Sequence, residues 1–169
     1  IGLTIGVATP ILLVALGTAA AAGPAAPELE AAQREGKPVL LLVHDASATG
    51  MEGARDVVQR AAALVPGGRT VEMDRGSAEN AALVAKFQLG MIQVPMVLVV
   101  ASNGVPVNMA VPRGVTPEQL AALVPSARKA DYYKALQEKK AVFVLVGRQE
   151  MPALAEARAI CDQADARLN

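Results

Sequence analysis

The residues that could carry chemistry are few, and they follow one apolar run. His44 and Asp45 come directly after Val39–Val43, and the hydroxyl residues Ser47 and Thr49 come next. Active residues of α/β folds tend to lie at the carboxyl ends of strands, and a histidine there could act as a general base. The spacing does not place a serine, a cysteine or a second carboxylate so that it completes a mechanism with them. We therefore expect no catalytic residue, and an ordinary surface or edge role for His44.

The cysteine and histidine counts exclude other kinds of site. The sequence has one cysteine, Cys161, and one histidine. A single cysteine forms neither an internal disulfide nor a cysteine-built metal site, and a single histidine does not make a multi-histidine site. We expect no metal and no cofactor.

The composition also argues against nucleic acid as a partner. The 169 residues contain 16 Lys and Arg against 16 Asp and Glu, so the formal net charge is zero. Electrostatically driven nucleic-acid binding needs a clustered basic excess, and aromatic residues for base stacking make up only 2%. With 53% hydrophobic residues the chain is not disordered overall, and its length suits about one domain with additional segments.

The N-terminal segment is apolar and uncharged. Glu28 is the first charged residue, and residues 1–22 are mostly Ile, Leu, Val, Ala and Gly. A helix of about 20 apolar residues spans the hydrocarbon core, and membrane helices tolerate a proline such as Pro10. A cleaved signal peptide, with residues 18–23 as its small-residue cleavage site, is the alternative. We expect residues 1–22 to be a retained transmembrane anchor in the lipid bilayer.

A hinge and a helix-packing pattern accompany this anchor. Residues 23–27 contain one glycine and two prolines, which end a helix. Gly2 and Gly6 have the spacing that lets a second membrane helix approach closely. We expect them to pack against other subunits of a membrane complex. The following domain is expected outside the cytoplasm, on the periplasmic side of a bacterial inner membrane.

Apolar runs and helical segments alternate through the next hundred residues. The pattern predicts helices over residues 28–35, 51–64, 78–87 and 117–124, and strands over residues 39–43, 69–73, 96–101 and 105–111. The first half is a βαβ unit, whose strands pair in parallel with a right-handed crossover. The second half is a hairpin at Asn103-Gly104 followed by a helix. This order predicts an α/β fold in which a small mixed sheet has helices on both faces.

That order, with Val94-Pro95 directly before a buried strand, resembles the thioredoxin-like superfamily. The resemblance covers residues 28–125, and Glu35–Pro38 ahead of the first strand is among its marks. It implies a cis peptide bond before Pro95, and backbone groups at Val94 that are free to pair with an extended peptide.

The resemblance also locates the place of the family's two redox cysteines. It puts Ala48 and Met51 there, with Thr49 between them, and neither side chain can exchange thiols and disulfides. The family's redox activity is therefore not carried over, and the site is expected to be degenerate. We predict a protein-binding surface made of Val94, Pro95, Ala48, Thr49 and Met51.

The C-terminal part repeats the start of the domain. A linking helix over residues 126–140 precedes an apolar run at 141–146 and a further helix, as residues 28–35 precede the first strand and helix. Residues 141–169 are thus expected to open a second thioredoxin-like repeat. One strand and one helix bury no core alone, so this unit either docks on the first domain or continues beyond Asn169; we favour continuation.

These features favour a non-catalytic, membrane-anchored structural or accessory subunit of a membrane protein complex, with its thioredoxin-like domain used as a scaffold for protein contacts. Two alternatives stay open. The first is a peptide-binding, chaperone-like module. The second is a redox protein with cysteines beyond residue 169.

Overall fold

The computed structural model describes residues 24–145, 147 and 151–168. The expected anchor over residues 1–22, with Gly2 and Gly6, lies outside the described residues, as does Gly23 of the hinge. Among the helices that are described, none has both the length and the apolar character needed to cross a membrane.

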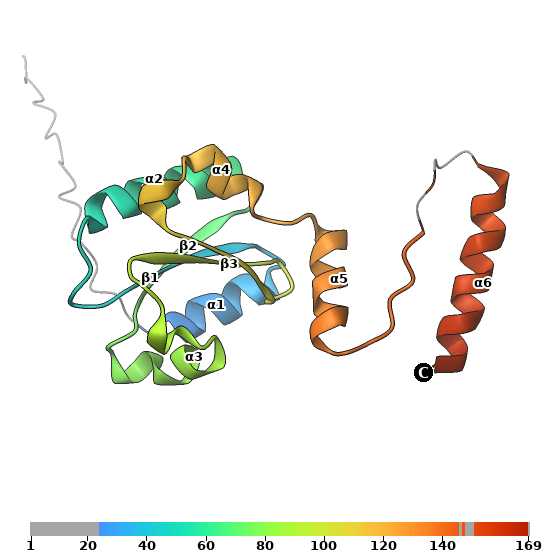
Figure 1. The fold of residues 1–169 in the computed structure, drawn as a ribbon, viewed down its shortest axis with the longest axis horizontal. Coiled ribbons are helices and arrows are strands. Elements are labelled where there is room, and N and C mark those ends of the chain that lie inside the picture. The colour runs from blue at the N-terminus through green and yellow to red at the C-terminus, as the bar shows by residue number, and fades with distance from the viewer. Residues whose placement is uncertain (1–23, 146, 148–150, 169) are drawn as a thin grey trace, which may run out of the picture.

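A four-stranded mixed sheet forms the centre of the domain (Figure 1). Its strands are β1 (Val39–His44), β2 (Arg69–Asp74), β3 (Met96–Val100) and β4 (Pro106–Ala110), in the order β2-β1-β3-β4. β1 pairs in parallel with β2 and antiparallel with β3, which pairs antiparallel with β4. A strand buried on both faces reads as a continuous run of Val and Leu, and β1 has that sequence.

Helices cover both faces of this sheet (Figure 1). α1 (Ala25–Arg34) and α3 (Ala81–Lys86) lie on one face, over Val39, Leu41 and Val43. α2 (Met51–Leu64) and α4 (Pro117–Ala122) lie on the other, over Leu40 and Leu42. The side chains of β1 alternate between the two cores because successive residues of a strand point to opposite faces.

The order of these elements and of the strands is that of the thioredoxin-like fold, as the sequence predicted. The peptide bond between Val94 and Pro95 is cis, which the resemblance also implied. Gly104 has φ of +82° in the turn between β3 and β4, where the Asn103-Gly104 pair predicted a hairpin.

Two helices differ from the sequence prediction. α1 begins at Ala25, so residues 25–27 of the expected hinge form its first turn. Pro27 is tolerated there because the amides of a helix's first turn have no acceptor within the helix. The expected helix over residues 78–87 is divided into a 3-10 turn (Ala78–Asn80) and α3, because Asn80 is buried and its side chain bonds Ala25 N and Asp74 O.

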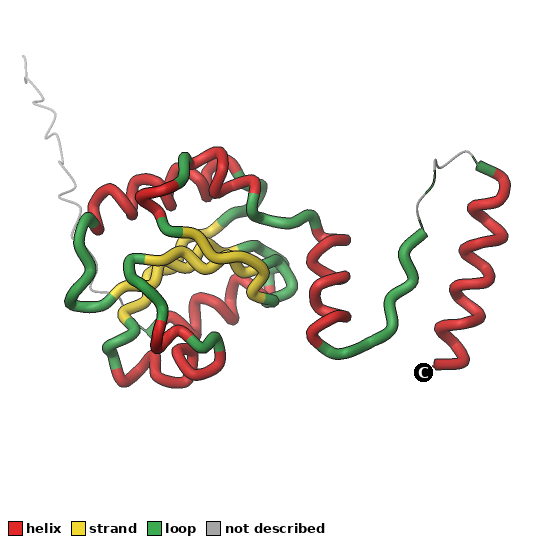
Figure 2. The backbone as a smooth tube through the Cα atoms, viewed as in Figure 1, coloured by secondary structure: helices red, strands yellow, loops and turns green. Residues whose placement is uncertain are grey.

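The C-terminal part differs more strongly. α5 (Ala127–Gln137), expected as a linking helix, packs on the domain: Ala130 is fully buried, and Asn103 Nδ2 donates to Asp131 Oδ1 at 3.3 Å. The strand expected over residues 141–146 is absent from 141–145, which have no regular secondary structure. A strand needs a paired neighbour for its backbone groups, and neither edge of the sheet receives this segment. α6 (Pro152–Leu168) forms close to the predicted place but lies apart from the sheet (Figure 2).

Candidate functional site

An open groove of about 490 Å³ lies at the end of the sheet where α2 and β3 begin. Thr49, Gly50 and Gly53 line it from α2 and the turn before it, and Val94 and Pro95 line it from the loop before β3. Its remaining lining is mostly apolar, with Val57, Val111 and Val115 among it and Arg113 as its charged member.

The start of α2 forms one wall of the groove. Gly50 precedes the helix with φ of +72°, in the left-handed region where glycine is strongly favoured. It has no side chain, so the first amides of α2 receive no side-chain cap from this position. A Cβ at position 50 would also lie 3.0 Å from Arg113 Nη2. The absence of a side chain at position 50 therefore leaves room for the Arg113 guanidinium beside the start of the helix.

The loop before β3 forms the opposite wall. The cis bond joins Val94 to Pro95, and β3 starts at the next residue, Met96. Within the described part of the chain, neither the backbone N–H nor the C=O of Val94 has a hydrogen-bond partner. These backbone groups are therefore available to an extended chain lying in the groove.

The hairpin supplies the third wall. Val97 of β3 pairs with Ala110 of β4, so residues 111–113 return beside residues 94–96. Val111, Pro112 and Arg113 thereby reach the groove, and Pro112 is buried. Arg113 is not among the residues that the sequence predicted for this surface. The predicted hairpin was the available signal, because antiparallel pairing brings the end of the second strand back to the start of the first.

Three of the five residues predicted to bind protein meet in this groove. Thr49, Val94 and Pro95 line it, whereas Ala48 and Met51 do not. Met51 is half-buried and packs on the core between the sheet and α2. The backbone N–H of Ala48 donates to Asp45 O at 3.1 Å, which holds this residue in the turn after β1.

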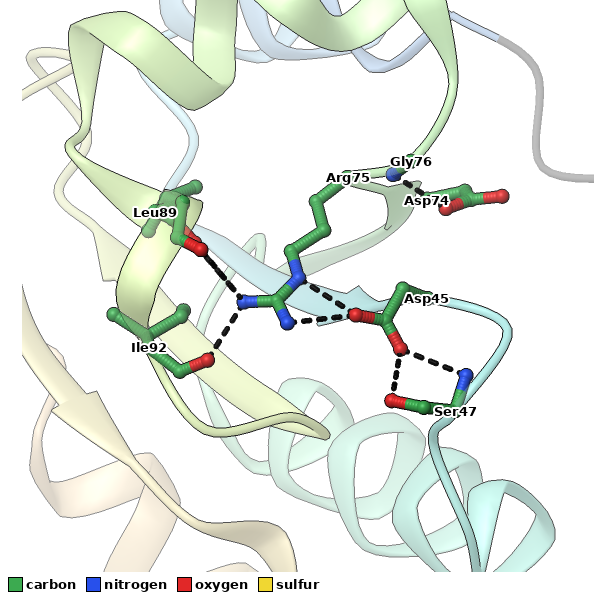
Figure 3. Close-up of polar contacts among 8 residues, drawn as sticks. Asp45, Ser47, Asp74, Arg75, Gly76, Leu89 and Ile92 are labelled. Carbon is green, nitrogen blue, oxygen red and sulfur yellow. Dashed lines mark hydrogen bonds and ion pairs between the residues drawn. The ribbon is translucent and has the colours of Figure 1, made fainter.

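Arg75 connects the turn after β1 to the loop before Pro95 (Figure 3). Its Nε and Nη2 atoms lie 2.8 and 2.7 Å from Asp45 Oδ2. Its Nη1 donates to the carbonyl oxygens of Leu89 at 3.2 Å and Ile92 at 2.6 Å. One planar guanidinium, whose donors have a fixed geometry, therefore holds two backbone segments on either side of it.

The Asp45 carboxylate receives further support within its own turn (Figure 3). Its Oδ1 accepts from Ser47 Oγ at 2.6 Å and from Ser47 N at 2.8 Å. The Ser47 hydroxyl, followed by Arg75, lowers the pKa of Asp45 from 3.8 to about 2. Asp45 therefore acts as an anionic anchor for the turn and is unsuited to accept a proton near neutral pH.

His44 belongs to a neighbouring charged group on the α2 side of the sheet. Its buried Nε2 is 3.1 Å from Glu72 Oε1 but lacks hydrogen-bond geometry. Glu72 is bound by Arg55 at 2.9 and 2.6 Å, and this arginine lowers the pKa of the Glu72 carboxyl. The group contains no hydroxyl or thiol for His44 to activate, so it has the features of a structural ion pair.

The described residues also offer little to a metal. Within residues 24–145, 147 and 151–168, no three His, Cys, Asp or Glu side chains gather in a way that could hold an ion. Cys161 is a free thiol on α6, far along the chain from the groove. What the groove presents is an apolar floor, free backbone groups at Val94 and one cationic side chain.

The strand order and the helices on both faces give the central part of the chain a thioredoxin-like α/β fold. No protein-family model matches the sequence, and no curated protein matches it. Several solved structures are similar. Trxlp from Edwardsiella tarda EIB202 is 16% identical with a TM-score of 0.45; the match covers 59% of this chain and 93% of Trxlp.

Two further structures are similar to this chain. A disulphide isomerase from Xylella fastidiosa Temecula1 is 19% identical with a TM-score of 0.44, over 68% of this chain and 92% of that protein. Thioredoxin O1 from Arabidopsis thaliana, in its oxidised state, is 13% identical with a TM-score of 0.40, over 68% of this chain and 93% of that protein.

Proposed function

We propose that this chain is a non-catalytic accessory subunit of a membrane protein complex, which uses the groove between α2 and the Pro95 loop to bind an extended segment of a partner protein. The observation that carries the proposal is the combination at that groove: an apolar surface beside free backbone groups at Val94. An extended segment can pair with such groups while its side chains occupy the apolar surface.

The non-catalytic part of the proposal is supported by the turn before α2. The thioredoxin-like resemblance puts Ala48 and Met51 where redox relatives carry two cysteines. Disulfide exchange requires an attacking thiolate, which neither side chain supplies. Asp45, with a pKa near 2, does not serve as a general base for other chemistry at neutral pH.

The membrane part of the proposal is supported by the composition of residues 1–22. That segment is uncharged and long enough to cross the hydrocarbon core. A tether of this kind would keep the domain close to one partner complex. The proposal therefore favours a permanent partner over the transient clients of a chaperone.

A pair of leucine substitutions on α2 tests this function. Gly53 lines the groove, and a Cβ there meets no other atom within 4 Å, so Gly53→Leu fills the groove without a clash at its first carbon. Ala63 is exposed on the same helix, so Ala63→Leu adds a leucine away from the groove. The tagged full chain is purified from native membranes in mild detergent.

We expect the wild type and Ala63→Leu to retain one set of proteins in a constant ratio through successive columns, and Gly53→Leu to lose it. Removal of residues 1–22 is expected to release the domain from the membrane fraction. Partners in variable amounts would favour the chaperone-like alternative. Equal retention by the two leucine variants would refute binding in the groove.

A further inference from the structure

The charge of the groove indicates which segment it binds. Arg113 is its charged lining residue, and none of the residues that line it is acidic. In the described part of the chain, no carboxylate lies within 4.0 Å of the Arg113 guanidinium. This contrasts with Arg55, Arg69 and Arg75, each of which has a carboxylate within that distance.

The position of Arg113 fixes where a ligand's charge would lie. A Cβ at position 50 would be 3.0 Å from its Nη2, so the guanidinium lies beside the start of α2. The free amides at the start of that helix give the same end of the groove a partial positive charge. The rest of the lining is mostly apolar, with Val57, Val94 and Pro95 as examples.

We infer that the groove selects an extended peptide with an acidic side chain, whose carboxylate pairs with Arg113 while its neighbouring apolar residues lie along the valines and its backbone pairs with Val94. This inference rests on the proposed function and adds the chemistry of the partner segment. Arginine suits this role because its planar group can bind a carboxylate through two parallel hydrogen bonds. Arg113 is thus a specificity-determining residue.

Capped peptides of alternating Val and Ala, with Asp, Asn or Lys at one central position, provide the probe. Their acetylated and amidated ends ensure that the central side chain carries the only charge that varies. A further peptide with Asn and a free C-terminal carboxylate distinguishes a side-chain carboxylate from a terminal one. Binding of these unlabelled peptides to the full chain is measured by isothermal titration calorimetry.

We expect the Asp peptide to bind about two- to fivefold more tightly than the Asn peptide, as a partly exposed ion pair allows. Added salt should reduce this preference, because it screens exposed charges. Arg113→Gln should remove the preference for the Asp peptide over the Asn peptide. Arg113→Glu should reverse it in favour of Lys. Arg128→Gln, which removes an exposed arginine from α5, should leave it unchanged.

The Gly53→Leu variant separates failure of this inference from failure of the proposed function. One outcome is that Gly53→Leu abolishes all binding, while the wild type binds the Asp and Asn peptides equally or Arg113→Gln has no effect. The groove then binds peptide, and the acidic preference is wrong. A preference that follows the terminal carboxylate overturns the inference in the same way. If no peptide binds, or Gly53→Leu binds as the wild type does, both the inference and the proposed function are wrong.

Discussion

Asp45 shows how single side chains hold the groove's surroundings in place. Its carboxylate receives Ser47 on one oxygen and Arg75 on the other, and Arg75 continues to the carbonyls of Leu89 and Ile92. The turn after β1 and the loop before Pro95 are therefore connected through two charged side chains. Loss of either charge should loosen both segments.

The lowered pKa of Asp45 gives this connection a pH dependence. The pKa is 3.8 without these contacts and about 2 in the folded protein. A lowered folded-state pKa stabilises the protein above the unfolded value, and that stabilisation is lost as the pH falls through the folded value. Above about pH 4, we expect the free energy of unfolding to be larger for the wild type than for Asp45→Asn. This difference should shrink as the pH falls towards 2.

Urea unfolding of both proteins across this range measures the difference. Asp56→Asn is the control, because Asp56 and its partner Arg60 are exposed and 3.4 Å apart. Such a pair contributes less than about 1 kcal/mol. A difference between wild type and Asp45→Asn that stays constant from neutral pH to about pH 2 would contradict the assigned role of Asp45.

At the residue scale, sequence predicted only part of the site. Pro95 and Val94 were found because an X-Pro pair before an apolar run is visible in the sequence. Thr49 was found by its place in the turn. Arg75 and Arg113 were missed because their roles depend on segments far away in sequence, Leu89–Ile92 for Arg75 and Gly50 for Arg113. Nothing local distinguishes them from exposed arginines.

At the level of elements, the start of α4 shows a local sequence pattern, a helix cap, that the structure confirms. Thr116, Pro117 and Gln119 have the residue types and spacing of a capped helix start. The structure has both bonds of the capping box: Gln119 N to Thr116 Oγ1 at 3.3 Å and Thr116 N to Gln119 Oε1 at 2.9 Å. The helix is only 6 residues long, and its Leu120 is fully buried against the α2 side of the core. Such a short helix depends strongly on its cap.

Two alanine substitutions compare a cap that forms with one that does not. Thr116→Ala should lower the free energy of unfolding by about 1 kcal/mol, the usual effect of losing an N-cap side chain. Ser77 also precedes a helical turn and is of a residue type that commonly caps helices, but its side chain makes no capping bond. Ser77→Ala should therefore change stability by less than about 0.5 kcal/mol. Urea unfolding checks both, and equal losses would show that the two caps do not differ as described.

The reason that Ser77 does not cap a continuous helix over residues 78–87 lies outside that segment. The segment that follows Ser77 turns at Asn80, whose buried amide bonds Ala25 at the start of α1. That contact joins residues separated by 55 positions. The periodicity of residues 78–87 therefore cannot predict it. The four strands were placed well because their apolar runs are local signals, whereas this break was set by a tertiary contact.

For the whole molecule, the distribution of buried residues shows where the folded unit ends. The buried hydrophobic side chains that the structure describes run from Ala25 to Ala130, and the described side chains of α6 and residues 141–145 are not among them. Sequence similarity between the two ends of the chain predicted a strand over residues 141–146. An apolar run becomes a strand only when another strand pairs with it, and that requirement cannot be read from the run itself.

Two truncations test where this unit ends. None of the described side chains in residues 141–169 is buried, so their removal should change the free energy of unfolding in urea by less than about 0.5 kcal/mol. Removal of residues 126–169 also deletes α5, with fully buried Ala130 and the contacts of Asp131 to Asn103 and Gln137 to Pro106. That protein should be less stable by roughly 1–3 kcal/mol, because the surface beneath α5 is exposed and hydrogen bonds are lost.

A large loss of stability from removing residues 141–169 would mean that these residues dock on the first domain, as one of the two sequence-based interpretations held. Similar stabilities for both truncated proteins would instead mean that α5 is only a linking helix. A helix that packs on the domain cannot be removed without lowering its stability.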